Sequence, residues 1–330
     1  MSNANDRITP PEPPKVSVCV ITYNHAKYIA RCLQSIVDQE TDFRFEIVVG
    51  EDHSTDGTLA IVEEFASRHP DKIRLLSNPT NLGGMGNYRL THGSARGELI
   101  AHCDGDDYWQ PGKLAAQVGF LDHRAQCSAV FTNSLVITED GRASGLFSRN
   151  VVPLFDTGYL IQKGNFLHHS SLMYRSLLRS SVMPDTGNYI DFEVYVRLSR
   201  LGPLGFIDQP LTTYRDQSGT SVVRGDREAI RRLYWQALRE AADGATDPVA
   251  VTSAHAHFLS GIVRQALVKS RMHSYRQWAA IVREAAPDQF STVRRSAWQI
   301  ALTGLASRVA QGAALRLGLV SPASKVYYPR

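Results

Sequence analysis

The 330-residue sequence lacks several features that mark other classes of protein. It has no run close to the roughly 18 consecutive apolar residues that a membrane-spanning helix needs. No GxGxxG follows the first predicted strand, and neither GxxxxGKS nor GxxxxGKT occurs, which argues against an NAD-dependent Rossmann oxidoreductase and a P-loop enzyme. No CxxC pair is present, so we expect buried free thiols in a reducing cytoplasm, rather than disulfides or a zinc site, at Cys19, Cys32, Cys103 and Cys127.

The two ends of the sequence differ from its middle. Residues 1–14 are polar and proline-rich and lack the apolar core of a signal peptide, so we expect a disordered lead-in. From Arg224 to the end there are 16 Lys and Arg against 7 Asp and Glu, whereas residues 1–223 hold 20 against 25. The acidic part is compatible with a metal site, and the basic part with an anionic partner such as a membrane surface. A solvated, arginine-rich helical face explains the basic part equally well.

Strands and helices alternate along the first 137 residues. Short apolar runs rich in β-branched residues predict strands at 16–22, 45–49, 73–76, 98–103 and 128–137. Helical spacing of apolar residues lies between them, at 25–37, 56–68, 88–95 and 112–123. This alternation predicts an α/β fold with a mostly parallel, Rossmann-like sheet flanked by helices.

The rest of the sequence is less regular. We expect loops over 138–165, a strand over 166–175, a helix over 190–200 and short strands at 205–209 and 211–215. Beyond Asp226 the Ala, Arg and Leu content and the helical periodicity predict about four helices, with breaks near residues 243–247, Ser270 and Pro287.

Polar residues follow three of the predicted strands, at Thr22-Tyr23-Asn24, at Glu51 to Ser54 and at Asp104 to Asp107. Because ligands of parallel sheets bind beyond the carboxyl ends of the strands, we expect these segments to converge. The last one places three carboxylates within four residues. A divalent cation, Mg²⁺ or Mn²⁺, would relieve their repulsion and would also hold substrate phosphates. Taken alone, the same residues also fit a solvated acidic turn.

Three ordered motifs together resemble family 2 glycosyltransferases of the GT-A fold, over about residues 15–220. They are the strand ending in Thr22-Tyr23-Asn24, the run EDHSTDGT from Glu51 to Thr58, and the run CDGDDYWQPGKL from Cys103 to Leu114. The resemblance implies a GT-A catalytic domain at 15–223, with a nucleotide-binding part at 15–137 and an acceptor part at 138–223. An α-helical C-terminal region at 224–330 lies outside it.

The resemblance also implies roles for individual residues. Thr22, Tyr23, Asn24, Asn87, Asp104 and Gly105 would bind the nucleotide sugar. Asp52 would accept a hydrogen bond from the base, with Glu51 either beside it or acting only as a cap. Asp106 would ligate the metal, while Asp107 would be either a group behind it or the metal ligand in place of Asp106. Trp109 would lie on the acceptor side.

A transfer also needs a base for the acceptor's proton. The family has an aspartate at a helix start, and Asp191 in the run YIDFEVYVRL matches it, although Ile190 replaces the usual glutamate. Glu193 is the second choice. The alternative for Asp191 is a helix N-cap.

Two positions depart from the family. Gly86 stands where many relatives have an arginine before Asn87, and Gln217 replaces the histidine after Tyr214-Arg215. Arg215, or a serine among Ser218 to Ser221, would then contact the diphosphate. His168 and His169 would lie near the acceptor, or would form a packed or solvated pair.

The resemblance implies an inverting, Mn²⁺- or Mg²⁺-dependent glycosyltransferase. It would move a sugar from a UDP-sugar or a similar donor to a saccharide or lipid-linked acceptor in surface polysaccharide or glycolipid synthesis. The alternative is a non-catalytic nucleotide-sugar-binding module whose helical tail recruits a partner. We expect a cytoplasmic protein without a nucleic-acid partner. Residues 226–330 would form either a peripheral contact with the inner face of the membrane or a bundle for dimerisation or capping.

Overall fold

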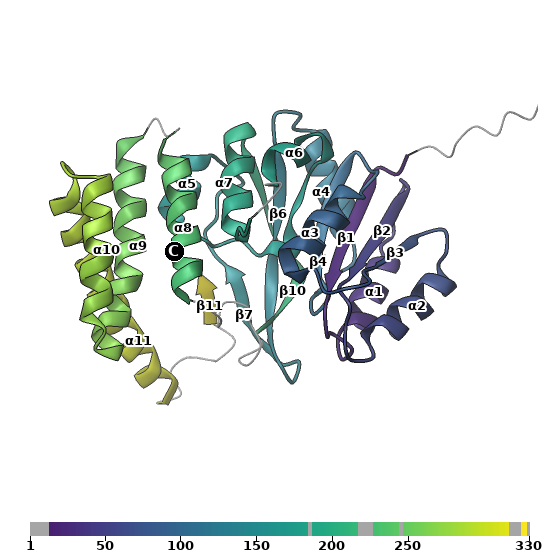
Figure 1. The fold of residues 1–330 in the computed structure, drawn as a ribbon, viewed down its shortest axis with the longest axis horizontal. Helices are drawn as coiled ribbons and strands as arrows, with labels where there is room; N and C mark the ends of the chain where they lie inside the picture. Colours follow the sequence, from purple (N-terminus) through teal and green to yellow (C-terminus); the bar gives the residue numbers. More distant parts are fainter. Residues whose placement is uncertain (1–12, 184–186, 217–226, 244–246, 317–324, 329–330) are drawn as a thin grey trace, which may run out of the picture.

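The computed structural model describes residues 13–183, 187–216, 227–243, 247–316 and 325–328. Within these residues one mixed sheet with helices on both faces is followed by long helices packed at its far end (Figure 1). This is the α/β architecture that the alternating patterns predict. Residues 1–12, which make up most of the expected lead-in, lie outside the described residues.

Four parallel strands form the first half of the sheet. In spatial order they are β3 (Ile73–Ser77), β2 (Phe45–Glu51), β1 (Val16–Thr22) and β4 (Leu99–Asp104). Thr22 pairs with Glu51 of β2, and Ile21 pairs with Asp104 of β4. The polar segments after β1, β2 and β4 therefore begin side by side at one edge of the sheet, as expected.

The second half of the sheet is mixed. Strand β9 (Met173–Arg175) lies antiparallel between β4 and β6 (Ala129–Thr138). Strand β6 also pairs with β7 (Ala143–Ser148), antiparallel, and with β10 (Leu204–Asp216), parallel. Two short strands, β5 (Tyr108–Trp109) and β8 (Leu154–Phe155), lie antiparallel to β10.

Several expectations for this half are wrong in detail. The expected loop over 138–165 holds β7, β8 and helix α5 (Thr157–Lys163), and most of the expected strand over 166–175 is irregular around the 3₁₀ turn η1 (His169–Ser171). The two expected short strands are one strand, β10, whose register shifts on both sides of Pro210 because proline cannot donate to the ladder. The C-terminal region is not helical to its end, because β11 (Lys325–Tyr328) pairs with β7.

Alternate residues of the central strands face two helical layers. Val16, Val18 and Val20 of β1 pack with the layer formed by α1 (Ile29–Val37), α2 (Thr58–Arg68) and α4 (Lys113–Asp122). Cys19 belongs to the opposite cluster, with residues of α3 (Gly83–Gly93) and α7 (Asp191–Leu201). The connection from β9 to α7 contains η2 (Ser176–Leu178) and α6 (Arg179–Val182).

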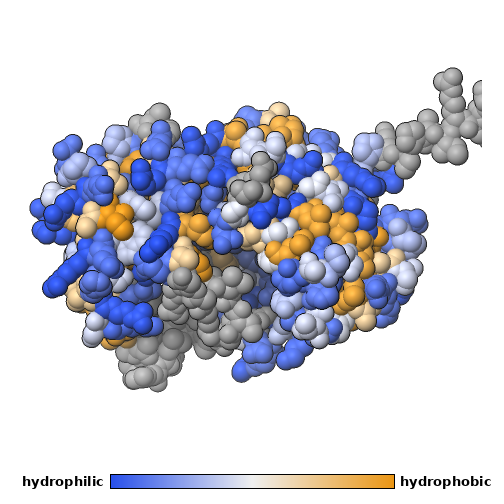
Figure 2. Space-filling model, in the orientation of Figure 1, coloured by the Kyte–Doolittle hydropathy of each residue, from blue (hydrophilic) through white to orange (hydrophobic). Residues whose placement is uncertain are grey.

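The C-terminal helices begin and end close to the predicted breaks. They are α8 (Arg227–Ala242), α9 (Pro248–Lys269), α10 (Met272–Ala285) and α11 (Phe290–Arg316). Their buried side chains, among them Trp235, Leu259 and Trp278, are continuous with the core cluster of α5 and α7. The bundle therefore docks on the sheet through a shared core, while its visible outer surface is mostly hydrophilic (Figure 2).

Candidate active site

A tight turn at the end of β4 brings the carboxylates to the loop after β1. The Gly105 N–H donates to the Ile21 carbonyl (2.9 Å), and the Asp107 N–H donates to the Asp104 carbonyl (3.0 Å). A Cβ on Gly105 would lie 2.7 Å from Oγ1 of Thr22, which is too close for a real contact. The glycine is therefore required by the close approach of the turn to the side chain of Thr22.

Asp107 is an internal anchor. Only 3% of the residue is exposed. Its Oδ2 accepts a hydrogen bond from Ser170 Oγ (2.6 Å) and lies 2.8 Å from His168 Nε2, while its Oδ1 accepts from the Arg215 N–H (3.1 Å). Both oxygens are thus engaged within the protein, which favours the predicted role of Asp107 behind the site over that of the metal ligand. His168 is also engaged on its other side, where Nδ1 lies 2.8 Å from Ser134 Oγ.

Asp106 is the carboxylate of this turn best suited to a cation. Burial, with the charges of Asp107 and Asp104, raises the pKa of Asp106 well above its ordinary value, so its charge is poorly compensated by the protein. No group of three or more His, Cys, Asp or Glu side chains among the described residues could hold a metal ion. Mg²⁺-type sites that also use substrate phosphates need only one or two carboxylates, and Asp106 fits that requirement.

Arg215 adds positive charge next to the turn. Its Nε donates to the Asp106 carbonyl (3.3 Å), and its guanidinium carbon lies 4.5 Å from the centre of the Tyr28 ring. The position is compatible with the predicted contact to a diphosphate. Gln217 and Ser218 to Ser221, the other residues considered for that contact, lie outside the described residues.

Asp191 and Glu193 have different surroundings, although both begin α7. Asp191 is not the N-cap, which is Ile190 without a side-chain cap, so the capping interpretation is wrong. Its side chain is 50% exposed, and burial around it, followed by the charge of Asp104, raises its pKa to about 6. Glu193 is buried and pairs with Arg197 (2.6 Å), which also contacts Glu240 of α8. Glu193 is therefore held within α7 by Arg197, which itself connects α7 to α8, and Asp191 is the more exposed of the two carboxylates.

A pair of buried histidines connects Asp191 with Asp104. Oδ1 of Asp104 lies 3.2 Å from Nε2 of His102, and Oδ1 of Asp191 lies 4.0 Å from Nε2 of His169. The two imidazole rings are adjacent, with centroids 4.3 Å apart. Burial opposes the charged form of Asp104, but His102 nearby, and more weakly His169, lower its pKa below the ordinary value. The two carboxylates therefore lie on the same side of the molecule, each next to one of two adjacent rings that are tilted by 45°.

The residues after β1 mainly build the loop. Tyr23 is 43% exposed and available to a ligand. Asn24 adopts a left-handed conformation (φ 56°), and its Oδ1 accepts from the Thr55 N–H (2.8 Å). Oε1 of Glu51 accepts from the Ser54 N–H (2.8 Å), so Glu51 holds the loop that precedes α2, while the N-cap of that helix is Gly57 without a side-chain cap.

Two predicted nucleotide-binding residues are buried beneath this loop. Asp52 is 2% exposed, and its Oδ1 accepts from the Leu82 N–H (2.8 Å) and from Asn78 Nδ2 (3.2 Å). Asn87 is equally buried, and its Nδ2 donates to the Gly50 carbonyl (2.8 Å). Asn87 thus holds α3 against β2. Asp52 binds the loop through Oδ1, and its contact with a nucleotide base stays a prediction.

The residues predicted to lie near the acceptor are buried. Trp109 is 2% exposed; its Nε1 donates to the Ser170 carbonyl (3.0 Å), and the Lys113 ammonium lies 3.8 Å from its ring centre. His169 is 6% exposed, with Nδ1 3.1 Å from the Tyr195 hydroxyl. Both side chains therefore pack beneath the turn and the start of α7, through Ser170 and Tyr195. Sequence reasoning missed Ser170 and His102, because neither residue type nor spacing marks them.

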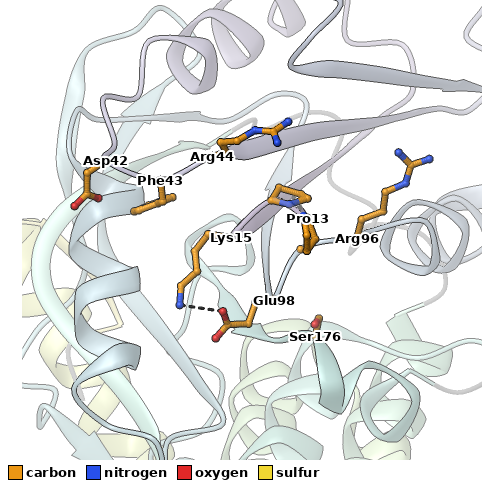
Figure 3. A pocket seen from close by; sticks show the side chains of 10 residues that line it. Pro13, Lys15, Asp42, Phe43, Arg44, Arg96, Glu98 and Ser176 are labelled. Atoms are coloured by element: carbon orange, nitrogen blue, oxygen red, sulfur yellow. Dashed lines mark hydrogen bonds and ion pairs between the residues drawn. The ribbon is translucent and has the colours of Figure 1, made fainter. Parts of the chain in front are cut away.

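A separate hollow of about 550 Å³ lies at the opposite end of the central strands (Figure 3). Its lining includes Lys15, which precedes β1, together with Arg44, Arg96 and Glu98. The Lys15 ammonium is paired with Glu98 (3.0 Å) and Asp122 (2.9 Å). None of the predicted site residues borders this hollow, so it is distinct from the carboxylate site.

Comparisons with known proteins identify the family and the fold of the chain. Residues 17–182 match the family model described as Glycosyl transferase family 2. A protein of Mycobacterium tuberculosis is 32% identical over 206 residues, which are 61% of this chain and 58% of that protein. The chain thus spans less than two thirds of the length of this relative.

Solved structures show the same fold. TarS of Staphylococcus aureus, a poly(ribitol-phosphate) β-N-acetylglucosaminyltransferase, was solved over residues 1–349 in complex with UDP-GlcNAc. That structure matches with a TM-score of 0.64 at 21% identity, covering 84% of this chain and 83% of the other. The mannosyltransferase PcManGT from Pyrobaculum calidifontis, in complex with GDP-Man and Mn²⁺, matches with a TM-score of 0.51 at 21% identity, covering 93% and 81%. The predicted GT-A fold is confirmed.

Proposed function

Because the chain belongs to glycosyl transferase family 2, we propose that it transfers a sugar from a nucleotide-diphosphate sugar, UDP-linked or similar, to an acceptor hydroxyl. The observation that carries the proposal is the placement of Asp104 and Asp191 on either side of the His102–His169 ring pair. One carboxylate stands in the turn that would hold the nucleotide. The other stands across the rings, where an acceptor can approach the sugar.

In this proposal Asp191 is the base of an inverting transfer. Its carboxylate takes the proton of the acceptor hydroxyl as the hydroxyl oxygen bonds to the anomeric carbon. The bond from that carbon to the diphosphate breaks in the same step, and the nucleotide diphosphate leaves with the electron pair. Half of the Asp191 side chain is exposed, so an acceptor can reach it.

Asp106 would hold Mn²⁺ or Mg²⁺. A bound cation would offset the charge that develops on the departing diphosphate. The Mn²⁺ in the PcManGT complex supports this assignment. Arg215 supplies a second positive charge from the side of β10, and the exposed ring of Tyr23 is available to the base.

The decisive experiment follows nucleotide release from UDP-, GDP- and TDP-sugars with Mn²⁺, for the wild type and for Asp191→Asn. We expect release with at least one donor and a loss of at least about 100-fold in the variant. Calorimetry should show that the variant still binds UDP, because Asp191 does not hold the nucleotide. Binding without release by the wild type would instead indicate a nucleotide-sugar-binding protein, and no binding at all would refute the family role.

For the acceptor, we propose a surface polysaccharide or glycolipid, with the helices α8–α11 facing an anionic membrane. The poly(ribitol-phosphate) acceptor in the name of TarS supports a polymeric acceptor. Residues 248–330 hold 11 Lys and Arg against 2 acidic residues, Glu284 and Asp288. At the α9–α10 corner, Val268 (67% exposed) and Leu267 (40%) stand beside Lys269, a combination that suits an anionic bilayer surface. No described helix is long and apolar enough to span a bilayer.

Liposome flotation tests the membrane contact. Wild type should float with vesicles containing anionic lipid and not with neutral vesicles, and Val268→Ser with Lys269→Glu should reduce the floating fraction several-fold. Equal behaviour of wild type and variant would leave the bundle as a dimerisation or capping element.

A further inference from the structure

Asp104 ends a chain of buried hydrogen-bonding groups that the transfer itself does not use. The Tyr174 hydroxyl lies 2.9 Å from Nδ1 of His92, and Nε2 of His92 lies 3.0 Å from Nδ1 of His102. Nε2 of His102 lies 3.2 Å from Oδ1 of Asp104. Tyr174, His92 and His102 are fully buried, and they come from β9, α3 and β4.

The chain has one self-consistent direction. Burial raises the pKa of Tyr174 well above its ordinary value, so the phenol keeps its hydrogen and can donate it to Nδ1 of His92. Burial likewise lowers the pKa of His92, so that ring is neutral and carries its one hydrogen on Nε2, toward His102. His102 then accepts at Nδ1 and donates from Nε2 to the carboxylate of Asp104.

The reverse direction is unfavourable at both ends. It would point the lone pair of His102 Nε2 at a carboxylate, and it would leave the Tyr174 hydrogen without an acceptor among the described residues. A buried polar group that loses its partner costs about 1–3 kcal/mol. Tyr174 therefore sets the tautomer of His102 two links away.

His102 is the main side-chain donor to Asp104. The single hydrogen of the Ser170 hydroxyl is directed to Asp107 Oδ2 at 2.6 Å, whereas Asp104 Oδ2 is 3.3 Å away. Without the Nε2–H of His102, the Asp104 carboxylate would lose the bond that fixes its rotation at the rim of the site.

We propose that Tyr174, His92 and His102 form a directional chain of positioning residues that orients the Asp104 carboxylate for the ribose of the nucleotide. The inference rests on the proposed function, since it takes Asp104 as a nucleotide-contacting residue. None of the three residues contacts the sugar or the acceptor, so the chain acts on the affinity for the nucleotide rather than on the chemical step.

Long-range ¹H–¹⁵N NMR of the full-length protein with ¹⁵N-labelled histidine tests the hydrogen-bonded chain without any substrate, because the spectrum identifies which ring nitrogen is protonated. We expect His92 and His102 both to carry hydrogen on Nε2 at pH 7.5, and Tyr174→Phe to remove this preference at His92. A His102 protonated on Nδ1 would overturn the proposal, whether or not the protein binds nucleotides.

Calorimetry with UDP and Mn²⁺ tests the consequence. Tyr174→Phe should weaken UDP binding about five- to tenfold, which is the effect of one hydrogen bond. The matched control is Tyr88→Phe, because the Tyr88 ring stacks on His92 (centroids 3.8 Å apart) while its buried hydroxyl has no hydrogen-bond partner within the described part of the chain. That control should bind UDP as the wild type does.

A third comparison separates positioning from packing. His102→Gln keeps a donor and an acceptor on one side chain, whereas His102→Leu keeps neither, so the glutamine variant should retain more UDP affinity at equal thermal stability. Equal loss in Tyr174→Phe and Tyr88→Phe, or no difference between the two His102 variants, would overturn the proposal. A wild type that fails to bind UDP would count against the proposed function. The tautomer measurement would then still test the hydrogen-bonded chain by itself.

Discussion

Oδ1 of Asp191 lies 4.0 Å from Nε2 of His169, a distance that permits attraction but is too long for a direct hydrogen bond. The carboxylate is therefore not held by the imidazole. It keeps room for an acceptor hydroxyl, while the protein around it and the charge of Asp104 disfavour its ionised form. In the proposed transfer, a base with a pKa of about 6 is strong enough to take the acceptor's proton near neutral pH.

This relationship predicts the acid limb of the reaction. The pKa of Asp191 is raised to about 6, and a base works only when deprotonated, so the transfer rate should fall about tenfold per pH unit below pH 6 and level off above it. A pH profile of kcat/KM from pH 4.5 to 8 measures this limb, with UDP affinity measured alongside at each pH. A limb near pH 4, the ordinary value of an aspartate, would contradict the assignment.

Loss of charge at Asp106 and at the adjacent Asp107 should have different effects on stability and on activation by Mn²⁺. Asp106→Asn relieves the repulsion among the aspartates of the turn, so it should leave thermal stability unchanged or raised while weakening activation by Mn²⁺ at least tenfold. Asp107→Asn disrupts the contacts with His168, Ser170 and Arg215 and should lower the free energy of unfolding by about 1–3 kcal/mol. Urea unfolding and Mn²⁺ titration check both. The reverse pattern would make Asp107 the metal ligand.

Gly105, which lies between Asp104 and Asp106, provides a steric test. A Cβ at Gly105 would lie 2.7 Å from Oγ1 and 2.8 Å from Cβ of Thr22, so Gly105→Ala must push the turn away from β1 and should weaken UDP binding at least tenfold. Gly84→Ala is the matched control, because a Cβ there meets nothing within 4 Å. Calorimetry with UDP compares the two, and equal affinities would show that the turn does not hold the nucleotide.

Local sequence patterns predicted the parallel half of the sheet and the helices well. The runs VSVCVIT and FEIVVGE carry enough apolar and β-branched residues to define β1 and β2. The breaks between α8 and α11 follow from Pro248 at a helix start and from Ser270 in a left-handed C-cap. Each signal lies within a few residues of its effect.

The remaining features depend on contacts between distant residues. Strand β11 exists because Lys325 and Val326 pair with β7, about 180 positions earlier, and nothing in its own short run requires this. Likewise, Asp107 and His168 are 61 positions apart, and Tyr174 and His92 are 82 apart. The sequence placed Asp104 and Asp191 at the ends of elements, but it could not show that two histidine rings lie between them.

Acid should destabilise the C-terminal bundle through His255 of α9. This side chain is 4% exposed and lies 5.0 Å from the Trp235 ring, and neither ring nitrogen has a hydrogen-bond partner among the described residues. Burial lowers its pKa below the ordinary 6.5, so the unfolded chain binds the proton more readily, and stability is lost as the pH falls below about 6.5.

His255→Leu removes both the unpaired nitrogens and the titration. We expect it to raise the free energy of unfolding by about 1–3 kcal/mol, with a larger gain at pH 5.5 than at pH 8. Urea unfolding at the two pH values measures this, with exposed His273→Gln as the control. A gain that is independent of pH would mean that the pKa of His255 is the same in the folded and the unfolded chain.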